Sequence, residues 1–253
     1  MKYFIYLITV LFVSSCTFLT GWDPVRNAAS VEAENLVSAL KNKNCNLNTF
    51  KGIGKIRQWN KYGSQVIRVA WMGKKPGQLR IAALGISGQP VATISSDGKY
   101  LYFISHTENR FNKMRSSDPN LKRIVSIPIK FSDVITMLSG GVPVRDYYYA
   151  SIARNEFGHV IVLKTRWNRV LEKIYLDNSK TMVYRIEMFA SGNNLVYSAD
   201  FGRIQNVGPY RIPFQMIFSN GNDEGFQLSV NRYWPDVQIS PSKFVLSSPK
   251  YRQ

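Results

Sequence analysis

The sequence has little of what disulfide-rich domains and many enzymes depend on. Its 253 residues include only two cysteines, Cys16 and Cys45, and two histidines, His106 and His159. A disulfide scaffold, a cysteine zinc cluster and any mechanism that needs several imidazoles are therefore excluded. Acidic residues are also scarce, 16 against 33 lysines and arginines, which gives a formal charge of +17. With 45% hydrophobic residues the chain can nevertheless bury a sizeable core, which argues against disorder.

The first sixteen residues have the pattern of an export signal. Lys2 is followed by an apolar run over residues 4–13, which is too short to span a bilayer comfortably, and then by two serines. The stretch Val13-Ser14-Ser15-Cys16 resembles the bacterial lipobox. We therefore expect residues 1–15 to be removed as a lipoprotein signal peptide and Cys16 to be acylated as the lipid anchor. The alternative is an ordinary signal peptide with a chance cysteine.

The excess of positive charge has to be interpreted together with export. A membrane-tethered, exported domain does not normally meet nucleic acid, so we expect no nucleic-acid partner in spite of the basic composition. Anionic lipid or glycolipid headgroups are the counter-charges that fit. By analogy with other bacterial lipoproteins, a residue other than Asp after the cysteine, here Thr17, favours transport to the outer membrane. Cys45 has no partner if Cys16 is acylated, and we expect it to be a buried or half-buried small residue.

After a short tether over residues 16–28, the pattern becomes that of one helix and then many strands. Apolar residues at Ala29, Ala33, Leu36, Val37 and Leu40 have helical spacing, and asparagines end the pattern. Five β-rich runs separated by turn signals follow, at residues 53–59, 66–72, 79–86, 91–95 and 100–105. Asp97-Gly98 is the strongest hairpin signal among them. Short loops between consecutive strands predict an antiparallel meander.

A helical interruption separates this meander from a second one. Asp118-Pro119 predicts a helix start with Leu121, Ile124 and Val125 on one face, and a second short helix follows over residues 131–138 and stops at Gly140-Gly141. Strands resume at residues 146–152, 159–165, 170–176, 182–189, 195–201, 212–218 and 226–233. We thus predict a mainly β fold of about eleven or twelve strands, one domain over residues 29–236, and an irregular Pro- and Ser-rich tail over residues 237–253.

A long antiparallel sheet of this kind curls, and three helical pieces are available to cover it. Such a sheet can enclose an apolar interior that its own side chains do not fill, which would be a ligand cavity. The alternative, which composition alone favours, is an ordinary packed core beneath the helices.

The order of these motifs resembles the LolA/LolB-type lipoprotein carriers, and most of all their outer-membrane receptor branch, LolB. The resemblance covers Phe50 to about Tyr233. It rests on Phe50-Lys51-Gly52-Ile53-Gly54 before the first strand, on residues 79–85 ending in Leu84-Gly85, and on the Ile127-Pro128 stretch with the helix and glycines after it. Tyr210-Arg211-Ile212-Pro213-Phe214 is similar to the motif before a late strand of the family.

The resemblance implies an incomplete antiparallel β-barrel that helices close on one side, with a cavity for acyl chains. Leu84 and Ile86 fall where the receptor branch carries an apolar membrane-insertion loop; an ordinary hairpin end is the alternative there. The candidate acyl-cavity residues, chosen by strand alternation, are Trp71, Ile81, Leu101, Phe103, Ile161, Leu163 and Met188. The implied partners are acylated lipoproteins, a periplasmic lipoprotein carrier and outer-membrane lipid. The protein would be a monomer without a cofactor, lipid-anchored to the outer membrane and facing the periplasm.

No motif for catalysis is present. Gly52-x-Gly54 lacks the third glycine and the helix of a dinucleotide loop, Gly85-Ile86-Ser87-Gly88 is not a nucleophile elbow, and neither histidine lies in a triad context. We therefore expect a protein that is not an enzyme. Two functions from different classes stay open: delivery of lipoproteins to the outer membrane, or a non-transport envelope lipoprotein of the same fold that binds a glycolipid, polysaccharide or protein partner. The Tyr147-Tyr148-Tyr149 run keeps glycan binding open.

Overall fold

A computed structural model describes residues 24–248, and within them one large antiparallel sheet dominates. The predicted signal peptide and lipid-anchor Cys16 lie outside the described residues. The first six strands are β1 (Thr49–Asn60), β2 (Gly63–Lys74), β3 (Gln78–Leu84), β4 (Pro90–Asp97), β5 (Tyr100–Ser105) and β6 (Arg110–Arg115). The other seven are β7 (Tyr149–Asn155), β8 (Gly158–Lys164), β9 (Val170–Leu176), β10 (Val183–Phe189), β11 (Leu195–Val207), β12 (Tyr210–Ser219) and β13 (Gly225–Pro235). The helices are α2 (Pro24–Asn42), α3 (Lys122–Val125), α4 (Phe131–Leu138) and the 3-10 turn η1 (Pro241–Phe244).

The sheet consists of two meanders that are joined along one strand pair. Its order is β6-β5-β4-β3-β2-β1-β13-β12-β11-β10-β9-β8-β7, so every neighbour is consecutive in sequence except β1 and β13. β1 and β13 pair antiparallel from Phe50 opposite Pro235 to Trp59 opposite Gly225, with one register shift after Ile53. The sheet does not close into a full barrel, because its two end strands, β6 and β7, are not paired with each other. This arrangement confirms the predicted mainly β, incomplete barrel.

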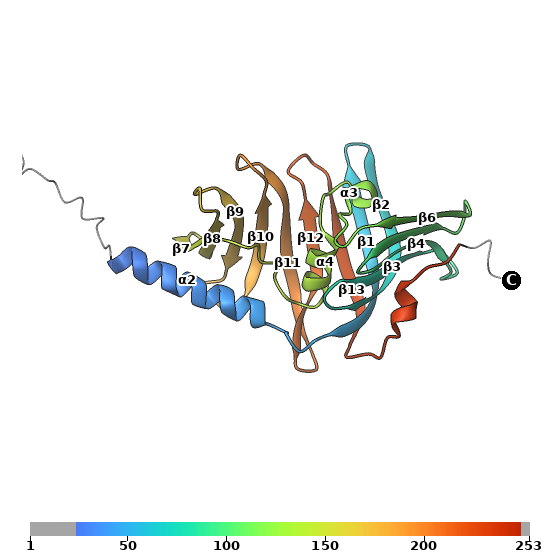
Figure 1. Cartoon of the computed structure of the whole chain (residues 1–253), viewed down its shortest axis with the longest axis horizontal. Coiled ribbons are helices and arrows are strands. Elements are labelled where there is room, and N and C mark those ends of the chain that lie inside the picture. The colour runs from blue at the N-terminus through green and yellow to red at the C-terminus, as the bar shows by residue number, and fades with distance from the viewer. Residues whose placement is uncertain (1–23, 249–253) are drawn as a thin grey trace, which may run out of the picture.

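The sheet curls around α4. Strands β3–β6 run across the direction of β10–β12 in Figure 1, and α4 contacts both β3 and β12, which are four positions apart in the sheet. Only a strongly twisted and curved sheet can bring two such strands against one short helix. The buried face of α4 consists of Phe131, Val134, Ile135, Met137 and Leu138, and it packs in the main hydrophobic core. α4 thus occupies the middle of the curve.

The predicted first helix is confirmed and covers the far end of the sheet. α2 lies along β7, the end strand, and buries Ala33, Val37 and Leu40 (Figure 1). The Ser30 hydroxyl donates to the backbone oxygen of Ala150 in β7 at 3.2 Å. A helix laid over an end strand also shields that strand from pairing with another chain.

The structure differs from the sequence prediction at three places. Strand β6 was not predicted, because its sequence Arg-Phe-Asn-Lys-Met-Arg carries three cations and lies at an exposed edge. β7 begins at Tyr149 and not at residue 146, since residues 142–148 cross the molecule without pairing as a strand. Cys45 is exposed and not buried as expected, because it lies in the turn after α2, where its thiol contacts the Asn46 side chain.

Candidate functional site

The hollow beneath α3 and α4 is an apolar space that the curled sheet encloses, with a volume of about 60 Å³. Its walls come from both meanders and from both helices. Each lining residue is apolar: Ile56, Val69, Trp71, Ile81, Leu121, Val125, Val134, Met137, Leu138, Met216, Phe218, Phe226 and Leu228. We call this space the inner hollow. An apolar cavity of roughly 150 Å³ holds a benzene molecule, so the inner hollow as it stands is too small for a fatty acyl chain.

Two of the predicted cavity residues lie in the wall of the inner hollow. Trp71 and Ile81 are opposite each other on β2 and β3, and the same cross-strand row continues through Ile94 to Phe103. Phe103 and its neighbour Leu101 are half-buried on the same face of the sheet but do not reach the hollow. All four side chains therefore lie on the inner face of the sheet.

The other three predicted cavity residues belong to the packed half of the core. Ile161, Leu163 and Met188 lie on β8 and β10 with exposed fractions of 2% or less, in the same core cluster as the buried face of α2. None of them lines the inner hollow. The structure thus separates the predicted set into residues beside the hollow and residues in solid core.

The tryptophan in the wall owes its position to glycine. The Trp71 ring lies across Gly52 and Gly54 on β1, and a Cβ atom at Gly52 would overlap the ring. The neighbouring row repeats the arrangement, with the Phe50 ring over Gly73. The glycines of the Phe50-Lys51-Gly52-Ile53-Gly54 motif therefore make room for an aromatic side chain from the next strand. The sequence motif by itself indicates only the start of a strand.

α4 is held in the curve by a buried polar cluster that sequence reasoning missed. Asp133, which is 3% exposed, accepts two hydrogen bonds from the Arg145 guanidinium at 2.9 and 2.6 Å, and a third from the Tyr197 hydroxyl at 3.0 Å. At the other end of the helix, the Tyr233 hydroxyl donates to the Leu138 backbone oxygen at 2.9 Å. Buried groups with this degree of pairing are costly to separate. We call Asp133, Arg145, Tyr197 and Glu172 the α4 cluster.

Glu172 is a member of the α4 cluster whose pKa is raised above its ordinary value. It is fully buried on β9, and its Oε2 accepts a hydrogen bond from the Arg145 backbone N–H at 2.9 Å. Burial raises the pKa of Glu172 to about 8, against the opposing effect of Arg145. Within residues 24–248 its Oε1 has no hydrogen-bond partner. A protonated carboxyl is therefore the form that this environment favours.

The two residues of the predicted insertion loop, Leu84 and Ile86, differ in exposure. Ile86 is 99% exposed at the tip of the loop between β3 and β4, whereas Leu84 is half-buried on the outer face of the sheet. The Arg68 guanidinium donates to the backbone oxygens of Gly85 and Ile86, each at 2.5 Å, and so fixes the loop. Ile86 is thus exposed to solvent on a loop that Arg68 fixes, whereas Leu84 lies half-buried against the sheet.

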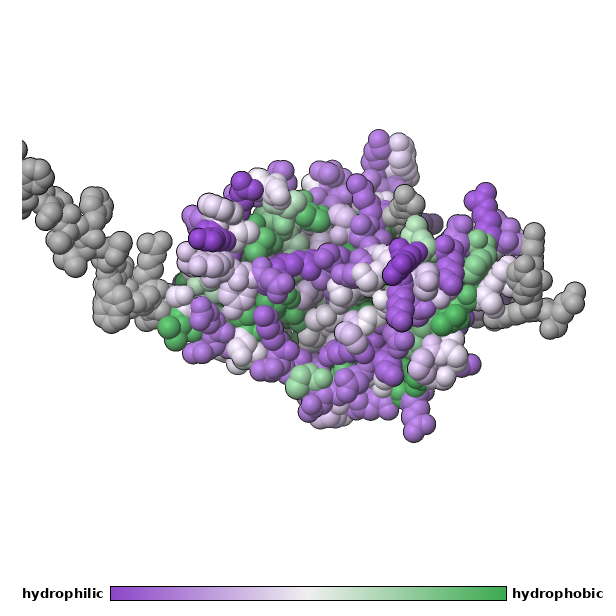
Figure 2. All heavy atoms as spheres, in the orientation of Figure 1, coloured by the Kyte–Doolittle hydropathy of each residue, from purple (hydrophilic) through white to green (hydrophobic). Residues whose placement is uncertain are grey.

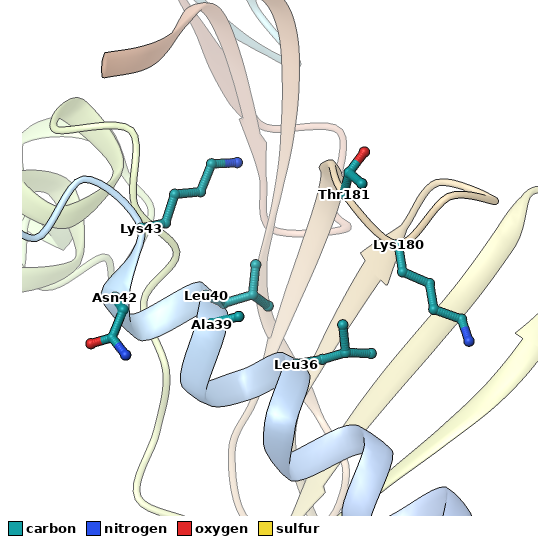
Figure 3. A pocket seen from close by; sticks show the side chains of 7 residues that line it. All are labelled: Leu36, Ala39, Leu40, Asn42, Lys43, Lys180 and Thr181. Atoms are coloured by element: carbon teal, nitrogen blue, oxygen red, sulfur yellow. The ribbon is translucent and has the colours of Figure 1, made fainter. Parts of the chain in front are cut away.

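The surface around these features is mostly polar. Figure 2 shows one face, on which hydrophilic side chains predominate and apolar residues gather in small patches. A further open pocket of about 300 Å³ lies between α2 and the turn before β10, where Leu36 and Leu40 face Lys180 (Figure 3). Lys180 forms an ion pair with Glu32 of α2. Burial and the nearby Arg211 lower the pKa of Lys43, which also lines this pocket. It contains none of the predicted site residues.

Two further features are absent from the described residues. No group of three or more His, Cys, Asp or Glu side chains there could hold a metal ion. None of the helices within residues 24–248 has the length and apolar character that crossing a membrane requires.

Comparison with known proteins identifies the fold. No protein-family model matches the chain, and no curated protein matches it. Among solved structures, it is similar to a LolA superfamily protein from Nitrosomonas europaea, with a TM-score of 0.58, 12% identity, and coverage of 85% of this chain and 97% of that one. An outer membrane lipoprotein-sorting protein domain from Vibrio parahaemolyticus gives a TM-score of 0.62, 10% identity, and coverage of 85% and 97%.

A third structure, a DUF1329 family protein from Desulfovibrio piger, gives a TM-score of 0.65 at 9% identity and covers 86% of this chain and 97% of that one. At these identities the similarity establishes the fold and leaves the receptor branch unassigned. The chain therefore has the incomplete β-barrel fold of LolA superfamily proteins.

Proposed function

We propose that this protein binds the acyl chains of lipoproteins in an enlarged form of the inner hollow and delivers them to the outer membrane, to which an acylated Cys16 anchors it. The proposal combines the LolA-type fold with the more specific receptor role that the sequence motifs indicate. The observation that supports it most is a hollow with exclusively apolar walls, placed beneath the short helix α3.

The proposal requires the inner hollow to open, and α3 is the element that can move. α3 has only four residues; at its start the Lys122 backbone N–H donates to Asn120 Oδ1 at 3.1 Å on the exposed surface, and a left-handed residue, Ser126, follows its end. Val125 of α3 and Leu121, directly before it, belong to the wall of the hollow. α4, by contrast, is held at both ends by the buried hydrogen bonds of Asp133 and Leu138. We therefore assign the opening to the segment around α3 and not to α4.

The energetics of such a carrier rest on relative affinity. Each CH₂ group of an acyl chain that leaves water contributes about 0.8 kcal/mol, so a free chain in the periplasm needs an apolar container. A container that needs no ATP must bind the chain more tightly than the donor and less tightly than the bilayer. Displacing α3 to admit a chain lowers the affinity of the open hollow, which favours release.

Filling the inner hollow is the direct test. Val125→Trp places a large ring in the space, and we expect it to weaken binding of a fluorescent triacyl lipopeptide at least about tenfold. Val31→Trp, on the exposed face of α2, is the matched control and should leave the affinity unchanged. Equal affinities for the two variants would contradict acyl binding in the hollow.

Delivery to the membrane is tested at the loop. Ile86→Ser should leave the folded state intact, because the side chain is exposed, and should reduce transfer of lipoproteins to outer-membrane vesicles. Phe157→Ser, an exposed apolar residue between β7 and β8 at the other end of the sheet, is the control. In cells, depletion of the protein should strand lipoproteins in the inner membrane. Correct sorting after depletion would favour the alternative, a non-transport envelope lipoprotein that binds a glycolipid, polysaccharide or protein partner.

A further inference from the structure

The outer face of β1–β3 carries a second, larger space. It lies between the sheet and the segment after β13, and its volume is about 550 Å³. Apart from Gly52 and Trp71, the strand residues that form it have the opposite parity to those of the inner hollow, so the two spaces open on opposite faces of the same strands. We call it the outer groove.

The floor of the outer groove is apolar, and two of its side chains are alanines. Ile53, Ala70 and Ala82 form one cross-strand row in the middle of the groove. Leu84 and Pro90 lie at the end of the groove that is nearest to the loop with Ile86. Small residues on an otherwise half-buried surface leave space that a flexible apolar chain can fill.

The other end of the outer groove is basic. Lys51, Met72 and Arg80 form the next row across the strands, and Lys243 joins them from η1. The Arg80 guanidinium donates to the Lys243 backbone oxygen at 3.1 Å, which fixes the turn at this place. Of the described residues that line the groove none is acidic, and neither lysine forms an ion pair with a carboxylate there. The groove therefore has an apolar path at one end and cations at the other.

The far wall of the outer groove is built and not merely a loose tail. After β13 the chain crosses the outer face of β3 and β4, where Phe244 and Leu246 are buried. Leu246 packs against Tyr102 and Ile104, and the Ser95 hydroxyl donates to the Phe244 backbone oxygen at 2.7 Å. Trp234, which is 42% exposed, completes the rim beside Lys51. The groove is thus a defined shape in the folded protein.

We propose that the outer groove binds one phospholipid with an anionic headgroup. The headgroup lies between Lys51 and Lys243, and one acyl chain follows the alanine floor towards Leu84 and Pro90. Charge complementarity at one end and apolar complementarity along the rest favour this occupant over a peptide, which would need partners for its backbone polar groups. The site goes beyond the proposed function, since it lies on the other face of the sheet and takes a membrane lipid and not lipoprotein cargo.

The test uses the full chain in its own membrane. With p-benzoylphenylalanine in place of Ala82, irradiation should attach a phospholipid to the protein, and mass spectrometry of the adduct identifies the headgroup. The same probe in place of Val125 reports separately on the inner hollow. An adduct at position 82 with an anionic phospholipid supports the proposal, whatever position 125 captures.

Charge reversal provides the second measurement. The Lys51→Glu, Lys243→Glu double variant should reduce the adduct yield at position 82 by about tenfold or more, because it replaces two attractive charges near an anionic headgroup with two repulsive ones. Lys61→Glu, in the exposed turn between β1 and β2, is the control and should change the yield less than about twofold.

Four outcomes would overturn the proposal: no adduct at position 82, an adduct with a zwitterionic lipid, an adduct with a protein or lipoprotein, or a yield that the double variant does not change. A lipoprotein adduct at position 125 together with any of these would leave the proposed function standing without the outer groove. An anionic phospholipid adduct at position 82 with no adduct at position 125 would support the outer groove and count against acyl binding in the inner hollow.

Discussion

The two faces of strands β1–β3 show how differently one sheet can treat apolar side chains. On the inner face large residues converge on α4 and leave about 60 Å³, whereas on the outer face small residues and one crossing segment leave about 550 Å³. The inner face is closed by buried polar pairs, and the outer face is open beside cations. The difference indicates that the interior has to move before it admits a large ligand, and that the exterior does not.

The largest effect is expected from breaking the α4 cluster. Asp133→Ala leaves the Arg145 guanidinium and the Tyr197 hydroxyl without their shared acceptor, and we expect the free energy of unfolding to fall by about 3–5 kcal/mol. Urea unfolding measures this. Glu108→Ala, which breaks the exposed pair with Arg110, should cost about 0–1 kcal/mol. If both variants lost equally little, the inner face would not depend on this cluster.

The wall that the two faces share gives the next effect. Trp71 lines both the inner hollow and the outer groove, and Gly52, beneath the Trp71 ring, lines the outer groove. Gly52→Ala forces the Trp71 ring away from β1, and we expect a loss of about 1–3 kcal/mol together with a change in tryptophan fluorescence. Gly202→Ala on β11 meets only the Gln215 side chain at contact distance and should cost less. A silent Gly52→Ala would mean that the ring does not depend on this glycine.

The sequence allowed the fold to be predicted further than the site. Strand runs, the helix at Ala33, Val37 and Leu40, and the helix ended by Gly140 are all local patterns, and each has the predicted place in the structure. Strand alternation also put Trp71 and Ile81 on one face. It could not show that α4 fills the curve beside them, because Asp133 is held by Arg145 and Tyr197, which are 12 and 64 residues away in the sequence.

Register shifts limited what alternation could predict. Met182, Tyr184, Ile186 and Met188 alternate in the sequence as if they shared one face. The pairing of β10 with β9 shifts between Val183 and Arg185, so that Val183 is buried together with Ile186. A bulge changes parity by one residue and leaves no clear trace in a single sequence. The outer groove could not be predicted for a different reason. One of its walls is the segment after β13, and the sequence of that segment predicts only an irregular tail.

The interior of the sheet should also make stability depend on pH through Glu172. Its folded pKa of about 8 lies above the ordinary value of 4.5, so its contribution is fully present below about pH 4.5 and is lost as the pH rises towards 8. Arg145, Asp133 and Lys41 are the charges that act on it. Relative to Glu172→Gln, the natural chain should lose up to about 1.4 kcal/mol per pH unit across this window.

Unfolding curves at several pH values measure that difference, with the exposed Glu108→Gln as the control for removal of one charge. A difference between the natural chain and Glu172→Gln that does not change from pH 4.5 to 8 would contradict a protonated Glu172 in the folded interior.

The smallest effect concerns the wall of the outer groove. Ser95→Ala removes the hydroxyl that donates to the Phe244 backbone oxygen, at an expected cost of about 1 kcal/mol. The loss should be local, because Phe244 and Leu246 still bury their side chains, and hydrogen exchange should quicken in residues 235–248 while α4 keeps its protection. Ser240→Ala, whose hydroxyl contacts only Ser242 at the surface, is the control. Faster exchange in α4 as well would mean that the two faces of the sheet are coupled, and that occupation of the outer groove can influence the opening of the inner hollow.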